Sequence, residues 1–261
     1  MRNKYRLGID AGGTFTDFVL AENNGELRVF KSPSTPQDGT IAIKAGLAQI
    51  SEAVGRSIEE IVQDCDLCIN GTTVALNALI EKKGVKVGLL CTEGHEDSLE
   101  IRLGHKEEGY RYEADFPPAH MIAPRHLRRP ISGRVLGSGE VITPLDEQQI
   151  REAVEYFRQQ AVESVAISFV WAVRNPEHEQ RAKQIVQEMM PGVFVCTGSE
   201  VYPQVREYTR TSTTVVNAYL SPVMRRYVEK IDEYFRSLGA KYPVRYFQSN
   251  GGLAVGEAMQ G

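Results

Sequence analysis

Four residues, Ala11-Gly12-Gly13-Thr14, separate two strand-like runs at the start of the chain. Residues 5–10 and 15–22 are rich in apolar side chains, and residues 27–31 form a third run of this kind. Because a connection this short joins antiparallel neighbours and glycine permits tight reversals, the sequence predicts a β-hairpin followed by a third strand.

The rest of the chain alternates between helical and strand-like patterns. Helical spacing covers residues 39–54, 74–83, 146–160, 176–190 and 211–238, and strand-like runs cover residues 67–70, 85–92, 165–170, 193–197 and 244–248. This alternation predicts an α/β protein with a mixed sheet and flanking helices.

Residues 94–145 interrupt the alternation. The stretch is polar, aromatic and rich in proline, and its strand-like runs 133–136 and 141–143 indicate a small hairpin. We therefore expect three parts: residues 1–93 as the first part of an α/β lobe, residues 94–145 as an insertion outside the main sheet, and residues 146–261 as the continuation of the lobe with the start of a following one.

Composition limits the partners. The chain has 261 residues, 30 Lys and Arg against 34 Asp and Glu, and no apolar run long enough to cross a bilayer, so neither nucleic acid nor membrane is expected. Without a signal-peptide pattern we expect a cytoplasmic protein whose four cysteines are free thiols. Cys65-x-x-Cys68 has no second pair that would complete a zinc site. The short basic run 125–129 predicts a surface or subunit contact.

The glycine turn carries the strongest chemical signal. Glycines there leave backbone N–H groups open to an anion, threonines add hydroxyl donors, and a carboxylate at the end of the first strand suits a hydrated Mg²⁺. A plain hairpin turn is the alternative, but the flanking aspartates favour a phosphate site. Its candidate residues are Asp10 as metal ligand and Gly12, Gly13, Thr14, Thr16 and Asp17 as phosphate-binding residues.

Three further polar segments stand at the ends of predicted elements. Gly71-Thr72-Thr73, with Asn77 one turn later, begins a helix, where Thr73 could equally be an N-cap. Arg210 to Asn217 begins the long helix, where Arg210 suits an anion but Thr211 or Ser212 could simply cap. Gln248-Ser249-Asn250 follows the last strand and could bind through amides or only end the strand.

Together these segments resemble the hydantoinase A and 5-oxoprolinase family, within the actin-like, sugar-kinase and Hsp70 ATPase superfamily. The resemblance rests on Gly-Gly-Thr-Phe-Thr-Asp (12–17), Asn-Gly-Thr-Thr-Val-Ala-Leu-Asn-Ala-Leu (70–79), the segment 210–220 and Gln-Ser-Asn-Gly-Gly (248–252). It implies a ribonuclease H-like lobe whose first part, residues 1–93, holds nucleotide phosphates.

The resemblance also implies an activity: ATP- and Mg²⁺-dependent phosphoryl transfer to a cyclic amide, which is then hydrolysed, or to a ketone, which is then carboxylated. Asp10 and Arg210 would be catalytic. Substrate-binding residues would be Gly71, Thr72, Thr73, Asn77, Ser212, Thr213, Asn217, Gln248, Ser249 and Asn250.

Only one phosphate loop is present, so we expect either a fragment or a half-subunit completed by a C-terminal half or a second, hydantoinase B-type subunit. A sugar-kinase-like enzyme and a non-catalytic assembly subunit are the alternatives.

Overall fold

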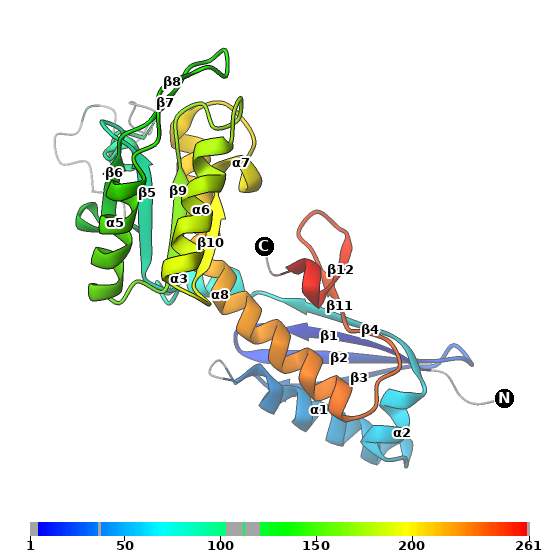
Figure 1. Ribbon diagram of the computed structural model, residues 1–261. Coiled ribbons are helices and arrows are strands. Elements are labelled where there is room, and N and C mark those ends of the chain that lie inside the picture. Colours follow the sequence, from blue (N-terminus) through cyan, green and yellow to red (C-terminus); the bar gives the residue numbers. More distant parts are fainter. Residues whose placement is uncertain (1–4, 36–37, 103–111, 113–120, 260–261) are drawn as a thin grey trace. The chain divides into compact units, whose positions relative to one another are not determined.

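The computed structural model describes residues 5–35, 38–102, 112 and 121–259. It divides into two compact units, which are described separately (Figure 1). Unit 1 comprises the described residues of 1–83 and 223–260, and unit 2 those of 84–222. Helix α8 (Glu207–Ser237) crosses the division and contains Pro222 at that point.

Unit 1 is built on a mixed sheet, for which six strands are described. Their order is β12-β11-β4-β1-β2-β3. Strands β1, β4 and β11 are parallel to one another, whereas β2, β3 and β12 run antiparallel to their neighbours. The strands are β1 (Tyr5–Ala11), β2 (Phe15–Glu22), β3 (Leu27–Pro33), β4 (Cys65–Thr72), β11 (Arg245–Phe247) and β12 (Leu253–Val255).

One face of this sheet forms the core of unit 1. In β1, Tyr5, Leu7 and Ile9 are buried and alternate with more exposed residues, as the period of two in a strand requires. They pack with residues of α1 (Gly39–Val54), α2 (Ile58–Gln63) and the unit 1 part of α8. Figure 1 shows α1 and α8 running along the sheet. The predicted α/β architecture with a mixed sheet and flanking helices is confirmed.

Local signals set the ends of these helices. Asp38 caps α1 by accepting from the Thr40 N–H, and Gly55 ends it in the left-handed conformation. Ser57 and Glu60 form a capping box at α2. Within α1, a Cβ on Gly46 would lie 2.2 Å from the Phe18 ring, so glycine is what lets α1 lie close against β2.

Unit 2 has a parallel sheet in the order β10-β9-β5-β6, with each described strand parallel to its neighbour. Both faces of such a sheet need cover, and β5 is buried along its whole length. The other elements include a small hairpin of β7 and β8. Bounds are β5 (Val87–Thr92), β6 (Arg128–Ile131), β7 (Arg134–Val135), β8 (Val141–Thr143), β9 (Ser164–Ser168), β10 (Phe194–Thr197), α4 (Ser98–Ile101), η2 (Arg125–Leu127), α5 (Glu147–Gln159), α6 (Glu177–Met189) and α7 (Gly198–Val201).

The structure groups the chain differently from the three expected parts. Strand β5, expected in the first lobe, pairs with β6 and β9 in unit 2. Residues 128–131, expected in an insertion outside the main sheet, form strand β6 of that same sheet, while residues 103–111 and 113–120 of the expected insertion lie outside the described residues. Hydrophobic periodicity identifies a strand but not the sheet that it joins, because pairing depends on distant residues.

The basic run 125–129 is not simply a surface patch. Arg128 is buried, and its guanidinium donates to the carbonyl oxygens of Ala123 and Glu96 and to the Glu100 carboxylate. These contacts hold the segment in place, so the predicted surface contact is wrong for Arg128. Across the described ranges, no helix is both long and apolar enough to cross a bilayer.

Candidate functional site

Three parallel strand ends bring predicted residues together at one edge of the unit 1 sheet. In the register of β1 and β4, Asp10 lies opposite Gly71 and Ala11 opposite Thr72. Strand β11 lies on the other side of β4, with Tyr246 opposite Asn70. Because all three strands run in the same direction, the Gly12–Thr14 turn, the 71–73 segment and the segment after β11 share this edge.

Ser34 makes two hydrogen bonds to the backbone of the turn between β1 and β2. The Ser34 hydroxyl donates to the Gly12 carbonyl oxygen at 2.7 Å, and the Ser34 N–H donates to the Thr14 carbonyl oxygen at 2.9 Å. Sequence reasoning missed this residue, which lies between two strand-breaking prolines with no motif of its own. Ser34 therefore fixes the backbone of the turn from outside the motif.

The donors of the turn divide into used and unused groups. The Gly12 N–H donates to the Phe15 carbonyl oxygen within the turn. Among the described residues, the N–H groups of Gly13 and Thr14 and the Thr14 hydroxyl have no acceptor, and both residues are exposed. Two adjacent backbone N–H groups without internal partners have the chemistry needed to bind an anion.

Thr16 differs from the rest of the predicted phosphate set. Its side chain is 1% exposed and its hydroxyl hydrogen-bonds the Ser34 hydroxyl at 3.0 Å. In β2 the residue points to the same side as the core residues Phe18 and Leu20. The strand period therefore places Thr16 behind the turn, where it supports Ser34 instead of contacting a ligand.

Asn77 reaches the turn from the short helix α3 (Val74–Ile80). A Cβ on Gly13 would lie 3.3 Å from Asn77 Nδ2, so the missing side chain of Gly13 lets the amide approach. The same Nδ2 donates to the Thr73 hydroxyl at 3.1 Å. The predicted grouping of the turn with Asn77 is thus present in the geometry.

The 71–73 segment is tied to β1 by the backbone. The Thr73 N–H donates to the Ala11 carbonyl oxygen at 3.3 Å, and the Thr72 hydroxyl accepts from the Val74 N–H. Thr73 occupies the N-cap position of α3 but makes no capping hydrogen bond with its side chain. The cap expected from Thr73 is therefore supplied by Thr72, and Thr73 remains exposed.

Two carboxylates stand beside the turn. Asp10 is exposed at the end of β1, and Asp17 lies opposite it in the antiparallel register, on the same face of the sheet. Lys31 pairs with Asp17 at 3.1 Å, leaving Asp10 as the exposed carboxylate nearest Gly71.

The donor set fits a magnesium ion that is held mostly by water and phosphate oxygens. Within residues 5–35, 38–102, 112 and 121–259, no three His, Cys, Asp or Glu side chains form a group that could hold a metal ion. A single carboxylate such as Asp10 fits Mg²⁺, which keeps several waters and shares phosphate ligands.

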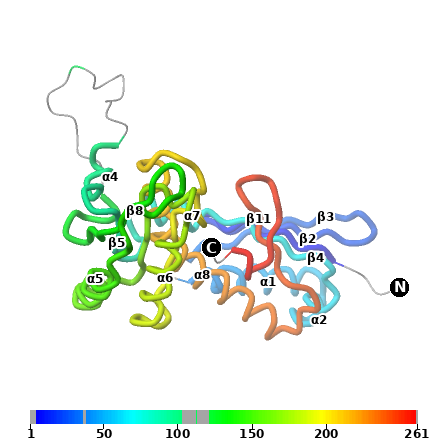
Figure 2. The backbone as a smooth tube through the Cα atoms, turned by 45° about the horizontal axis from the view of Figure 1, so that its top comes forward, coloured from blue at the N-terminus to red at the C-terminus, as the bar shows by residue number. Residues whose placement is uncertain are grey.

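Residues 248–252 form the turn between β11 and β12 (Figure 2). The Gln248 N–H donates to the Gly252 carbonyl oxygen, and the Asn250 side chain accepts from the Gly252 N–H. Ser249 and Asn250 are exposed. The segment therefore forms a structural turn between two strands, as the alternative interpretation predicts. The side chains of Ser249 and Asn250 nevertheless remain accessible to solvent.

Arg210 lies in unit 2 and is 1% exposed. Its guanidinium donates to the carbonyl oxygens of Gln204 and Phe169 at 2.8 and 3.1 Å. Gly198 lies between Arg210 and Glu179, and the positive charge of Arg210 acts to lower the pKa of the buried Glu179 carboxyl, which burial raises overall. These contacts give Arg210 a structural environment, so the catalytic role expected for it has no support from the geometry.

The expectation that residues 211 or 212 cap the long helix is wrong. Helix α8 begins at Glu207, so the hydroxyl-rich segment lies inside it. Its hydroxyls bond back to carbonyls of the preceding turn, the usual use of serine and threonine within helices. Ser212 and Thr213 donate to the Thr209 carbonyl oxygen, and the Asn217 side chain accepts from Ser221.

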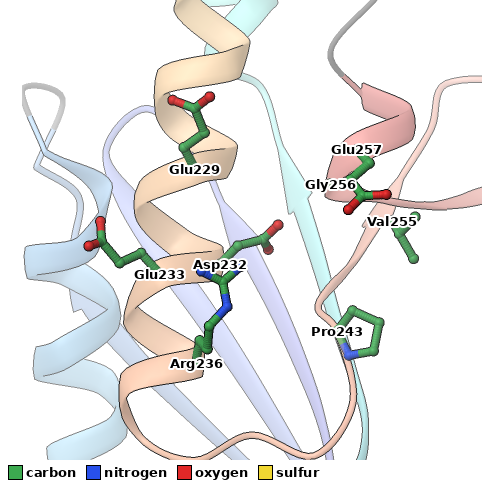
Figure 3. A pocket seen from close by; sticks show the side chains of 8 residues that line it. All are labelled: Glu229, Asp232, Glu233, Arg236, Pro243, Val255, Gly256 and Glu257. Carbon is green, nitrogen blue, oxygen red and sulfur yellow. The ribbon is translucent and has the colours of Figure 1, made fainter.

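A cavity of about 510 Å³ in unit 1 is lined by none of the predicted site residues (Figure 3). Its lining residues come from α8 and from the C-terminal segment, and Figure 3 shows Asp232 of α8 pointing toward that segment. Most of its charged groups are acidic, which disfavours phosphate. The lining residues are Glu229, Asp232, Glu233, Arg236, Pro243, Val255, Gly256 and Glu257.

The cysteines are structural. Cys68, Cys91 and Cys196 are buried, and burial raises the pKa of the Cys91 thiol to about 12 and of Cys196 to about 11. Burial also raises the pKa of Cys65. These thiols therefore stay protonated at neutral pH, and a nucleophilic thiolate is not available among them.

Comparison with known proteins gives the same assignment over most of the chain. Residues 6–190 match the hydantoinase/oxoprolinase N-terminal region, and residues 210–261 match hydantoinase/oxoprolinase. The caprolactamase subunit alpha of Pseudomonas jessenii is 69% identical over 99% of this chain.

Two solved structures share the fold. The crystal structure of the ATP-dependent caprolactamase from Pseudomonas jessenii superposes with a TM-score of 0.90 and 71% identity over 97% of this chain and 36% of its own. Nucleotide-free acetone carboxylase superposes with a TM-score of 0.87 and 29% identity over 99% of this chain and 38% of its own. The chain spans 37% of the length of the caprolactamase subunit. With both family regions matched, the chain belongs to the hydantoinase/oxoprolinase family.

Proposed function

We propose that this chain carries the nucleotide phosphate site of an ATP-dependent enzyme that opens a cyclic amide. The observation that carries the proposal is the exposed turn in which the N–H groups of Gly13 and Thr14 have no acceptor among the described residues, next to the Asp10 carboxylate. The 69% identity to a caprolactamase subunit also supports the proposal, because it favours a lactam substrate over a ketone.

In the reaction, the amide oxygen attacks the γ-phosphorus while the bond to the ADP oxygen breaks. Water then opens the activated ring and releases phosphate. Gly13 and Thr14 would hold phosphate oxygens through their N–H groups, because charge stabilisation supplies most of the catalysis in phosphoryl transfer. The Asn77 amide, 3.3 Å from where a Gly13 Cβ would be, would close the same side of the site.

Asp10 would hold the magnesium ion through water. When bound, the ion neutralises charge on the phosphates. Asp17, paired with Lys31, would act as a neighbouring charge and not as a direct ligand.

A ketone substrate is the second candidate. Acetone carboxylase shares the fold at a TM-score of 0.87, and the acetophenone carboxylase gamma subunit of Aromatoleum aromaticum is 33% identical over 95% of this chain. The acetophenone carboxylase and caprolactamase relatives are named as subunits, which supports a partner subunit for this chain, and we propose a hydantoinase B-type subunit in that place. A complete site would then need residues outside this chain.

The test uses the complete enzyme together with any subunit that copurifies with it. Lactam ring opening and phosphate release are measured with Mg-ATP for the wild type and for Asp10→Asn. We expect Asp10→Asn to lower turnover at least about 100-fold, since it removes a charge used in the transition state. Its melting temperature should stay within about 2 °C of the wild type, because Asp10 is exposed.

Asp66→Asn is the matched control, since Asp66 lies at the opposite end of the sheet, as the second residue of β4, and forms an ion pair with Arg6. It should keep wild-type turnover. Full activity in Asp10→Asn would contradict the proposed site. ATP hydrolysis that depends on a ketone and bicarbonate, and not on a lactam, would select the second candidate.

A further inference from the structure

A buried polar pair lies beneath the candidate phosphate site. Tyr227 of α8 and Asn70 of β4, both in unit 1, are 8% and 0% exposed. The Tyr227 hydroxyl lies 3.1 Å from Asn70 Nδ2 and 3.2 Å from Asn70 Oδ1. A polar pair in an otherwise apolar core is stable only when its members satisfy one another, so it fixes a specific arrangement.

The strand register puts this pair next to the site. Asn70 immediately precedes Gly71, and its partner residue in β1 is Ile9, which immediately precedes Asp10. Successive strand residues point to opposite faces, so Asn70 faces the core where Gly71 and Asp10 face away from it. Burial raises the pKa of the Tyr227 hydroxyl. Hydrogen bonding with the side chains of Asn70 and Thr72 acts to lower this pKa, and the charge of Asp10 acts to raise it.

The ring of Tyr227 is fixed from its other side by α1. A Cβ on Gly39 would lie 2.8 Å from Tyr227 Cε2, so only glycine leaves room for the ring. One turn further along α8, Lys230 pairs with Asp38, the N-cap of α1, at 3.0 Å. The close approach of Gly39 to the ring and the Lys230–Asp38 ion pair therefore fix the position from which the Tyr227 hydroxyl contacts β4.

The Tyr227 contact adds a side-chain restraint to the end of β4, which the backbone pairs with β1 as far as Thr72. Gly71 has no side chain to pack, and the Thr73 N–H continues the connection to β1 by donating to the Ala11 carbonyl oxygen. A hydrogen bond from the core at Asn70 restrains the last residue before Gly71.

We propose that Tyr227 is a positioning residue for the phosphate site: its hydroxyl holds Asn70 and thereby sets Gly71 and Thr72 relative to Asp10. The expected effect on nucleotide affinity rests on the proposed function. The structural half of the inference, the restraint on the end of β4, stands on the geometry alone.

The test compares Tyr227→Phe with Tyr246→Phe in the complete enzyme. Tyr246 is a matched control because it is also buried in the same core and lies opposite Asn70 in the sheet, while its hydroxyl donates to Asp232 at 2.8 Å instead of bonding Asn70. Each variant is measured for binding of a non-hydrolysable Mg-ATP analogue and for amide hydrogen exchange in residues 70–74.

Tyr227→Phe should weaken nucleotide binding roughly five- to tenfold, the scale of one buried hydrogen bond. It should also speed exchange in residues 70–74. Tyr246→Phe should change neither, although both variants lose some thermal stability. Asn70→Leu should match Tyr227→Phe in both readouts, and the double variant should be no worse than either single one because the two residues act as a pair.

Equal effects of Tyr227→Phe and Tyr246→Phe on exchange in residues 70–74 would overturn the inference. So would wild-type affinity and exchange in Tyr227→Phe. If the wild type binds no nucleotide while Tyr227→Phe still speeds exchange only in residues 70–74, the proposed function fails and the restraint on β4 is supported.

Discussion

The polar segments of unit 1 and unit 2 use their hydrogen-bonding groups in opposite ways. In unit 1, Asp10, Gly13 and Thr14 are exposed, and the two N–H groups of the turn have no acceptor among the described residues. In unit 2, Arg210 and Thr214 are buried, and their side chains bond to backbone carbonyls. The exposed turn of unit 1 thus keeps backbone donors available for a ligand, whereas the polar side chains of the α8 segment in unit 2 are used mainly within the fold.

The difference also separates two kinds of charge. The Asp10 carboxylate faces solvent, where a counter-ion can reach it. Glu179 is fully buried and accepts from the N–H groups of Phe169 and Ser199, with Arg210 nearby. Buried charged groups of this kind organise the fold, because hydrogen bonds from the backbone replace the water that cannot reach them.

The largest expected effect is on Arg210. Arg210→Met removes two charge-assisted hydrogen bonds of a buried guanidinium, to the carbonyl oxygens of Gln204 and Phe169, and should cost about 3–5 kcal/mol of unfolding free energy. Thermal unfolding should show a drop of roughly 10 °C or more. Arg151→Met, at an exposed pair with Glu147, should change little. If Arg210→Met has the melting temperature of the wild type but loses turnover, the contrast between the two units is wrong and Arg210 acts in catalysis.

An effect of intermediate size is expected when one glycine in each unit is replaced and nucleotide affinity is compared. Gly13 and Gly137 both lie in hairpin turns, and a Cβ on either would meet its neighbour at 3.3 Å, Asn77 Nδ2 in one case and the Trp171 ring in the other. Gly13→Ala should weaken Mg-nucleotide binding about tenfold, or about 1.4 kcal/mol. Gly137→Ala should leave affinity unchanged. Calorimetric titration measures both, and equal losses would contradict the assignment of the site to unit 1.

The smallest expected effect is on pH dependence in unit 2. Burial lowers the pKa of His178 below its ordinary 6.5. Below pH 6.5 the unfolded chain takes up a proton before the folded one, so stability from the neutral histidine is present above that pH and is lost as pH falls through the folded pKa. Denaturant unfolding at pH 7.5, 6 and 5 should therefore show a falling difference between wild type and His178→Gln.

His95→Gln, a half-buried histidine of the same unit, provides the control for this series. A constant difference between wild type and His178→Gln across the three pH values would show that His178 contributes through packing alone. The effect is limited to about 1.36 kcal/mol for each unit of pKa displacement.

Much of the fold could be predicted from local pattern. Helix α1 has its expected bounds because its apolar period, Asp38 and Gly55 agree. Helix α2 was missed, although Ser57 and Glu60 carry a capping-box signal, because six residues are too few for a period. Strand β6 was missed because it contains Arg128, Arg129 and Pro130, and the buried Arg128 guanidinium is satisfied in part by Glu96 and Glu100, which lie 32 and 28 residues away in sequence.

The candidate site was predictable where it depends on the backbone. Glycines and threonines of 12–14 and 71–73 mark the strand ends, and parallel pairing of β1 with β4 then brings them together. Exposure was not predictable: Thr16 and Arg210 have the right chemistry but face the interior. Asn70 stands in a segment that the sequence singles out, but the supporting roles of Ser34 and Tyr227 depend on contacts 22 and 157 residues away along the chain, for which the sequence alone carries no signal.

The most direct test is the structure of the complete enzyme with a non-hydrolysable Mg-ATP analogue. The account predicts phosphate oxygens about 3 Å from the N–H groups of Gly13 and Thr14, with the metal ion bound through water to Asp10. A triphosphate bound elsewhere, with this turn empty, would contradict it.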